Sequence, residues 1–169
     1  TYIADSEISE FNRMKTTEWM DISEDFAFVV QSSFEYYKLS DGLYDITVMP
    51  LVNLWGFGPD KFIDIPTTTN IDSVLAFIGQ DLIEVESNRI RKKDPRVQID
   101  LSSIAKGFAV DKIIESLNYD NIFVEIGGEV RSKSNEKIWK VGINTPSIDN
   151  ISNEIEYIAP IKNGSIATS

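Results

Sequence analysis

Segments in which apolar residues recur at helical spacing alternate along this chain with short segments of strand-like pattern, and no repeat or low-complexity tract interrupts them. The longest helical segment is marked by five apolar residues at that spacing: Phe26, Val29, Val30, Phe34 and Tyr37. Asp21 and Glu24 resemble a capping pair ahead of it, and the turn at residues 40–42 ends it. The alternation predicts an α+β fold, a single domain with packed helices and a mixed or antiparallel sheet.

Two more helices and a series of strands complete the expected order. One helix is predicted over residues 71–78, stopped by Gly79, and another follows Ser103. The second is expected to bury one side, formed by Ile104, Phe108, Ala109, Ile113 and Leu117. Strands are predicted over residues 82–86, 88–92, 97–101, 122–126, 129–132, 139–143 and 155–161, followed by a turn into a small-residue strand.

Composition excludes several classes of function. The 169 residues are 42% hydrophobic and 25% charged, which is typical of one soluble globular domain. A net charge of −11 without a long basic run argues against a nucleic-acid partner. The chain has no cysteine, which excludes thiolate chemistry, and no histidine, which excludes a Ser-His-Asp triad and histidine-based zinc sites.

The two ends of the sequence suggest a larger polypeptide. No apolar stretch reaches the roughly 20 residues of a transmembrane helix, and no signal peptide opens the chain. The first residue is Thr1, and residues 161–169 form a turn and a short strand that stops abruptly. We therefore expect residues 1–169 to be one domain that is incomplete at both ends.

Residues 97–112 predict a strand followed by a helix, with polar groups gathered at the junction. Asp100, Ser102, Ser103 and Lys106 lie at or near the helix start, where unpaired N–H groups and the helix dipole favour an anion. Asp100 is an oxygen ligand of the kind that holds Mg²⁺ against a phosphate. The alternative is that these residues only cap the helix.

Residues 40–59 predict a strand broken by proline and then an aromatic loop. Asp45 and Thr47 alternate with apolar residues, so one side of this strand would be polar. Trp55 and Phe57 stand between glycines, and such a loop could wrap an aromatic ligand or anchor itself on the core. Together with the helix junction, these features suggest a nucleotide-like ligand.

A glycine pair separates two of the predicted strands. Gly127 and Gly128 permit positive φ, so they form either a simple hairpin turn or a place where a ligand lies against bare backbone. The flanking Glu125 and Glu129 could bond a polar ligand or face water.

Four separated segments together resemble the ApbE family of flavin transferases, formerly described as thiamine biosynthesis lipoproteins. They are residues 1–12, 41–59, 100–107 (DLSSIAKG), and 124–129 (VEIGGE) continued by 139–146 and 165–169. The resemblance covers essentially the whole chain and implies an ApbE-like, T-fold-like architecture. It also implies an Mg²⁺-dependent enzyme that transfers the FMN half of FAD to a threonine hydroxyl of an acceptor protein and releases AMP.

The same resemblance implies site residues, position by position. The FAD contacts correspond to Tyr2, Leu43, Tyr44, Asp45, Asp100 and Lys106, and Ser103 corresponds to a metal ligand, expected through its main-chain carbonyl. No catalytic residue or general base is assigned. Met49 departs from the glycine that is more frequent in the family. Because the family's upstream segment and its downstream histidine, aspartate and threonine are absent here, we expect this chain alone to bind metal poorly and to be catalytically impaired.

Two other functions remain open at this point. Water could replace threonine, which would make the protein an FAD pyrophosphatase that releases FMN and AMP, or the protein could bind flavin without catalysis. A purely structural domain is a third interpretation. By resemblance, the acceptors are expected to be flavinylated subunits of redox pumps, and the location is expected to be the periplasmic face of a bacterial inner membrane, reached through a lipid anchor.

Overall fold

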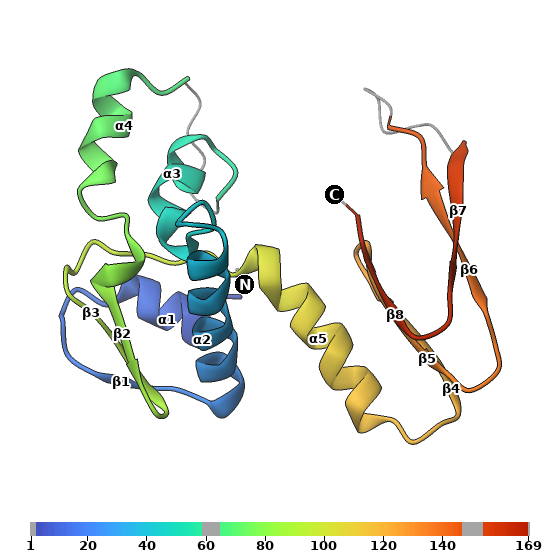
Figure 1. Ribbon diagram of the computed structural model, residues 1–169. Helices are drawn as coiled ribbons and strands as arrows, with labels where there is room; N and C mark the ends of the chain where they lie inside the picture. Colours follow the sequence, from blue (N-terminus) through green and yellow to red (C-terminus); the bar gives the residue numbers. More distant parts are fainter. Residues whose placement is uncertain (1–2, 59–64, 147–153, 169) are drawn as a thin grey trace. The chain divides into compact units, whose positions relative to one another are not determined.

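The computed structural model contains both helices and antiparallel sheets, which confirms the α+β class (Figure 1). The structure describes residues 3–58, 65–146 and 154–168. The chain divides into two compact units, a first unit of residues 1–104 and a second unit of residues 105–169, and each is described separately below. Among the described residues, no helix combines the length and apolarity that a membrane span requires.

The first unit is built around two N-terminal helices, α1 (Glu7–Arg13) and α2 (Glu24–Leu39). The cap of α2 is Ser23, whose side chain accepts from the Phe26 N–H, so the predicted capping role of Asp21 is wrong. Asp21 instead pairs as part of the short strand β1 (Met20–Asp21). The predicted apolar face of α2 is buried at Phe26, Val29 and Val30 and half-buried at Phe34 and Tyr37.

The predicted strand after residue 44 is wrong, because these residues turn into helix. A 3₁₀ turn η1 (Ile46–Val48) leads directly into the helix α3 (Met49–Leu54). Pro50 lies in the first turn of α3, where its missing N–H is not needed and its fixed φ fits a helix. Proline here starts a helix, whereas the alternation of polar and apolar residues had suggested an interrupted strand.

Residues 65–92 form a helix and a hairpin. The helix α4 (Thr68–Leu75) starts earlier than predicted because Thr67 and Asn70 form a capping box, and a 3₁₀ turn η2 (Gln80–Leu82) follows Gly79. The predicted hairpin is confirmed as β2 (Ile83–Glu86) and β3 (Arg89–Lys92). With β1 they make an antiparallel sheet of order β1-β3-β2, and residues of α2 contact β2 (Figure 1).

Residues 97–101 are extended but do not form the predicted strand. Their side chains alternate as expected, with Val97, Ile99 and Leu101 buried. However, Ile99 does not pair with a strand: its N–H donates to Asn12 Oδ1 at 2.8 Å, and its carbonyl accepts from Asn12 Nδ2 at 2.8 Å. One asparagine side chain therefore takes the place of a neighbouring strand.

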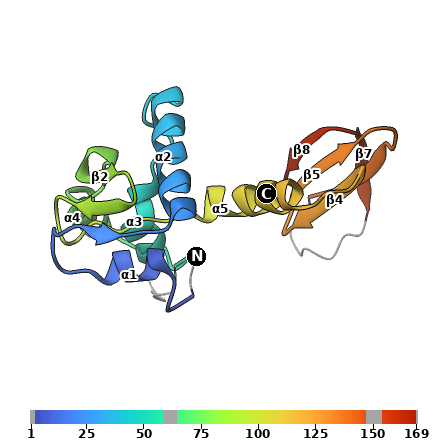
Figure 2. The same ribbon diagram turned by 90° about the horizontal axis from the view of Figure 1, so that it is seen from below.

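The second unit holds the other sheets. The strands β4 (Asn121–Ile126), β5 (Glu129–Ser134) and β8 (Gly164–Ala167) form an antiparallel sheet of order β4-β5-β8, and β6 (Trp139–Asn144) pairs with β7 (Ile155–Ile161). Figure 2 shows β4, β5 and β8 lying next to one another. These positions confirm the strands predicted after residue 121.

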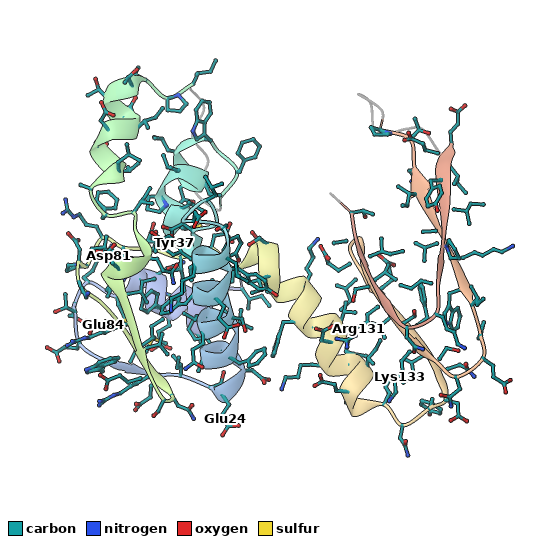
Figure 3. The ribbon with its side chains drawn as sticks, in the orientation of Figure 1. Glu24, Tyr37, Asp81, Glu84, Arg131 and Lys133 are labelled. Carbon is teal, nitrogen blue, oxygen red and sulfur yellow. The ribbon has the colours of Figure 1, made fainter. Side chains whose placement is uncertain are left out.

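The helix α5 (Ser102–Ser116) begins where predicted, but its buried face is rotated by about one residue. Val110 and Ile114 are buried, whereas Ile113, predicted to be core, is 39% exposed. Asp111 of α5 pairs with Arg131 of β5 at 2.5 Å, and Figure 3 labels Arg131. The side of α5 that holds residues 110, 111 and 114 therefore faces the sheet.

Candidate functional site

In the first unit, a tyrosine meets the start of α5 across a long stretch of sequence. The Tyr44 hydroxyl lies 3.0 Å from Ser103 Oγ, and the Tyr44 ring meets the Tyr36 ring edge to face at a centroid distance of 6.0 Å. Burial raises the pKa of Tyr44 above its usual range. A protonated tyrosine hydroxyl can donate a hydrogen bond as well as accept one.

Asp45 is held next to this tyrosine by its own chain. Its Oδ1 accepts from the Thr47 N–H at 2.8 Å and from Thr47 Oγ1 at 2.6 Å, as expected for an aspartate that caps the turn η1. The Gly79 N–H donates to the same Thr47 hydroxyl at 2.7 Å. Asp45 is thereby connected through Thr47 to the segment between α4 and η2.

Asp100 brings the start of α5 beside the same turn. Its N–H donates to the Ile46 carbonyl at 2.8 Å, which joins residue 100 directly to η1. Its Oδ1 accepts from the Ser102 N–H at 2.8 Å, so the carboxylate occupies one of the donors at the helix start. This second bond agrees with the capping interpretation of Asp100 and leaves its role toward a ligand as a prediction.

The first unit thus brings together several of the predicted site residues. Tyr44, Asp45, Asp100 and Ser103 are connected by the contacts above, and Leu43 adjoins them with 91% of its surface exposed. Tyr2 lies outside the described residues. Their roles in binding FAD stay predictions.

The aromatic loop after α3 is exposed. Trp55 is 49% exposed and Phe57 is 80% exposed, which does not fit the interpretation that they anchor the loop on the core. The ligand-wrapping interpretation stays a prediction.

Lys106, in the second unit, contacts the glycine pair. Its Nζ donates to the Gly127 carbonyl at 2.9 Å and lies 3.5 Å from Glu129 Oε1. The side chain is 45% exposed, so the ammonium remains open to solvent while it is partly neutralised. Lys106 of the DLSSIAKG motif therefore contacts Gly127 and Glu129 of the VEIGGE motif, a contact that the sequence alone does not indicate.

Gly127 and Gly128 form the turn between β4 and β5. Their φ angles of +53° and +91° lie in the left-handed region, and the register pairs Ile126 with Glu129 across the turn. The Gly128 carbonyl accepts from Thr168, and its N–H donates to Glu125 Oε1 at 3.0 Å. The hairpin interpretation is confirmed, and Glu125 serves the turn itself.

Sequence reasoning missed the residues that support this arrangement. The sequence marks Asn12 only as part of a segment that resembles the family, and it predicts Gly79 only as a helix stop. Lys92 was not singled out at all, although it is fully buried, with Nζ 3.1 Å from the Met14 carbonyl and 2.8 Å from the Val97 carbonyl. A lysine in a strand carries no local sign of such burial, because one of its carbonyl partners, Met14, is 78 residues away and the other, Val97, lies in the loop that follows the strand.

The described residues do not by themselves make a metal centre. No group of three or more acidic side chains with metal-binding geometry occurs in residues 3–58, 65–146 and 154–168. At the start of α5, where the resemblance implies Ser103 as a metal ligand, the side chains of Asp100 and Ser103 already accept or share hydrogen bonds. Hard cations need more oxygen ligands than these two supply.

Comparison with known proteins extends over the whole chain. A profile of the ApbE family matches residues 1–169. The FAD:protein FMN transferase of Haemophilus influenzae is 39% identical over 181 residues, which cover 100% of this chain and 52% of the relative. That of Vibrio cholerae is also 39% identical, again with 100% of this chain and 52% of the relative covered.

Solved structures agree with this match. The flavin transferase ApbE from Vibrio cholerae superposes with a TM-score of 0.87 at 37% identity and covers 99% of this chain and 56% of its own. The ApbE protein of Thermotoga maritima gives a TM-score of 0.81 at 27% identity, over 97% of this chain and 54% of its own. The chain spans about half the length of the relatives it matches, and it belongs to the ApbE family.

Proposed function

We propose that this ApbE-family chain binds FAD and takes part in transferring FMN from FAD to an acceptor protein. The observation that carries the proposal is the match of the entire chain to proteins named FAD:protein FMN transferase, at up to 39% identity. The cluster around Tyr44, Asp45 and Ser103 supports it, because these hydrogen-bonding groups are held together by the contacts described above and can recognise the polar groups of a dinucleotide.

The proposed reaction is a phosphoryl transfer. A threonine hydroxyl oxygen of the acceptor attacks the phosphorus of the FMN half, and the bond between that phosphorus and the bridging diphosphate oxygen breaks. AMP leaves with the electron pair, and the hydroxyl proton passes to solvent or to the leaving phosphate. Such a reaction depends on positioning and on electrostatic stabilisation of the phosphate oxygens.

Several residues can contribute to FAD binding and to this phosphoryl transfer. The Tyr44 hydroxyl can hydrogen-bond the ligand, and Asp45 can accept from a ligand hydroxyl. Lys106 can offset phosphate charge, although Glu129 partly neutralises it in the ligand-free protein. When bound, Mg²⁺ would neutralise charge on the diphosphate, with Ser103 as one proposed ligand; the described residues do not complete that site, and no step is assigned to it.

The family resemblance also supports proposals on partner and place. The acceptor would be a flavinylated subunit of a redox pump, and the enzyme would work at the periplasmic face of a bacterial inner membrane through a lipid anchor. Both proposals can be tested by finding which membrane proteins carry covalent FMN when the gene is present or deleted.

The first experiment titrates FAD into this chain and into the complete gene product, with and without Mg²⁺, and follows products by chromatography. Mg²⁺-dependent FAD binding by the complete product, with FMN attached to a threonine of an acceptor and AMP released, is the expected result. Release of free FMN and AMP at the same rate with and without acceptor would make the protein a pyrophosphatase. Binding without any product would make it a flavin carrier, and no binding at all would overturn the flavin proposal.

Replacement of Lys106 tests whether this side chain of the second unit contributes to FAD binding or turnover. We expect Lys106→Ala to weaken FAD binding or turnover of the complete product by about 10-fold, since an ammonium bonded to phosphate contributes on the order of 1–2 kcal/mol. Folding should be unchanged because Lys106 is 45% exposed. The matched control is Lys140→Ala, which removes an exposed lysine from β6; equal FAD affinity in both variants would reject the role of Lys106.

A further inference from the structure

The side chain of Thr47 is fully buried and hydrogen-bonds both Asp45 and Gly79. Its side chain is 0% exposed, its Oγ1 lies 2.6 Å from Asp45 Oδ1, and the Gly79 N–H donates to the same Oγ1 at 2.7 Å. A hydroxyl has one proton and two lone pairs. Because Gly79 occupies a lone pair, the single proton of Thr47 is directed at the carboxylate of Asp45.

This arrangement fixes how Asp45 is presented. Oδ1 receives two hydrogen bonds, from the Thr47 backbone N–H and from its hydroxyl, whereas Oδ2 has no partner among the described residues. An ionised carboxylate with one oxygen already satisfied offers the other as an acceptor of fixed direction. On FAD the complementary groups are donors, namely the ribityl and ribose hydroxyls and the ring N–H, and not the anionic diphosphate.

From this geometry we propose that Thr47 is a positioning residue that orients Asp45 so that its Oδ2 accepts a hydrogen bond from a hydroxyl or N–H group of FAD. This inference rests on the proposed function and deepens it by naming the part of the ligand that Asp45 recognises. Thr47 itself does not reach the ligand, because its hydroxyl is buried and both of its hydrogen-bonding roles are occupied by Asp45 and Gly79.

A purely structural role makes a different prediction. If Thr47 only fastened Gly79 to η1, its loss would lower stability, and any effect on FAD affinity would be independent of Asp45. If Thr47 acts through Asp45, the two residues are coupled, and the effect on FAD affinity of removing one disappears when the other is already gone.

The experiment is a double-mutant cycle on FAD affinity in the complete gene product, measured by quenching of flavin fluorescence, with thermal unfolding recorded in parallel. Thr47→Val keeps the volume but removes the hydroxyl, and we expect affinity to fall about 5- to 10-fold, the size of one hydrogen bond. Thr47→Ser keeps the hydroxyl and should bind within about 2-fold of the wild type. In the Asp45→Asn background, Thr47→Val should have no further effect on affinity.

A second variant keeps the test decisive if Thr47→Val does not fold. Asp45→Glu retains the charge but moves the carboxylate by one methylene away from the two Thr47 donors, and it should bind FAD as poorly as Asp45→Asn. Wild-type affinity of Thr47→Val or Asp45→Glu, or additive losses in the double variant, would overturn the positioning role while leaving FAD binding intact. If the wild-type protein itself binds no FAD, the proposed function fails and this inference fails with it.

Discussion

The two units hold their predicted site residues in different ways. In the first unit the contacts join positions far apart in sequence, 59 residues between Tyr44 and Ser103 and 87 between Asn12 and Ile99, and Ile99 and the Thr47 that holds Asp45 are buried. In the second unit Lys106 reaches a hairpin turn that neighbouring strands already define, and its contacts are exposed. The first arrangement depends on individual side chains, whereas the second depends mainly on backbone geometry.

The largest expected effect is a loss of stability when Asn12 is replaced, because its side chain bonds the backbone of Ile99 where a strand would otherwise pair. Asn12→Ala leaves the buried N–H and carbonyl of Ile99 without partners, so the free energy of unfolding should fall by about 2–5 kcal/mol. Urea unfolding measures this, with the exposed Asn135→Ala as the control, for which a change within about 0.5 kcal/mol is expected. Equal losses in the two variants would contradict the importance of the long-range contact.

The buried Lys92 should make the first unit depend on pH. Burial, and then repulsion by Lys15, lower its pKa from 10.5 to about 8, so the folded state releases the proton before the unfolded state does. Between about pH 8 and 10.5 the unfolded chain binds more protons, and stability contributed by this residue therefore rises with pH, by up to about 3 kcal/mol, and is level below and above that window.

The measurement is the free energy of unfolding at several pH values for the wild type and for Lys92→Met. The difference between the two proteins isolates Lys92 from the other groups that titrate above pH 9. Parallel curves from pH 8 to 10.5 would show that this lysine keeps an ordinary pKa despite its burial.

In the second unit, the turn geometry itself should be the sensitive feature. Gly128 has φ of +91°, and a Cβ added there would lie 2.8 Å from Thr168 Oγ1 and 3.0 Å from the Thr168 carbonyl oxygen. Gly128→Ala should therefore cost about 2 kcal/mol. Gly107→Ala is the matched control, because its Cβ would meet no atom within 4 Å and alanine favours the helix α5.

Hydrogen exchange can assign this loss to the second unit. Faster exchange is expected at the amides of β4 and β5 in Gly128→Ala, and slower or unchanged exchange in Gly107→Ala. If the two glycine variants were equally stable, the backbone of the turn would not be the feature that holds the second unit's site.

The smallest expected effect belongs to the exposed hydrogen bond of Tyr44. Tyr44→Phe removes the contact with Ser103 Oγ but keeps the ring against Tyr36, so stability should change by no more than about 1 kcal/mol. Tyr157→Phe, at a tyrosine that is 58% exposed, is the control. A loss several times larger than in the control would mean that this contact supports the fold of the first unit as well as the candidate site.

The regular parts of the fold could be predicted because their signals are local. The hairpins β2–β3 and β4–β5 follow from alternating residues on either side of a turn, and the glycine pair 127–128 supplies the positive φ that the second turn needs. The family resemblance likewise named Tyr44, Asp45, Asp100 and Ser103 before any geometry was known.

The remaining features could not be predicted because they depend on tertiary context. Residues 97–101 have the burial pattern of a strand, but Asn12 supplies the hydrogen bonds, and no local signal marks that asparagine. Pro50 fits a helix start as well as a strand break, so its local preference does not decide between them. The face of α5 that is buried depends on its packing against the sheet, and the pairing of Asp111 with Arg131 is likewise a contact that only the three-dimensional fold brings together.

The asparagine that stands in for a strand has a consequence for self-association. Residues 97–101 combine apolar and β-prone side chains, and an extended segment of this kind with free backbone groups is a template for pairing between chains. By occupying both backbone groups of Ile99, Asn12 blocks the register in which another copy could add itself there. Because Val97, Ile99 and Leu101 are buried, pairing through this segment would require it to open first, and the bonds of the Asn12 amide oppose that opening.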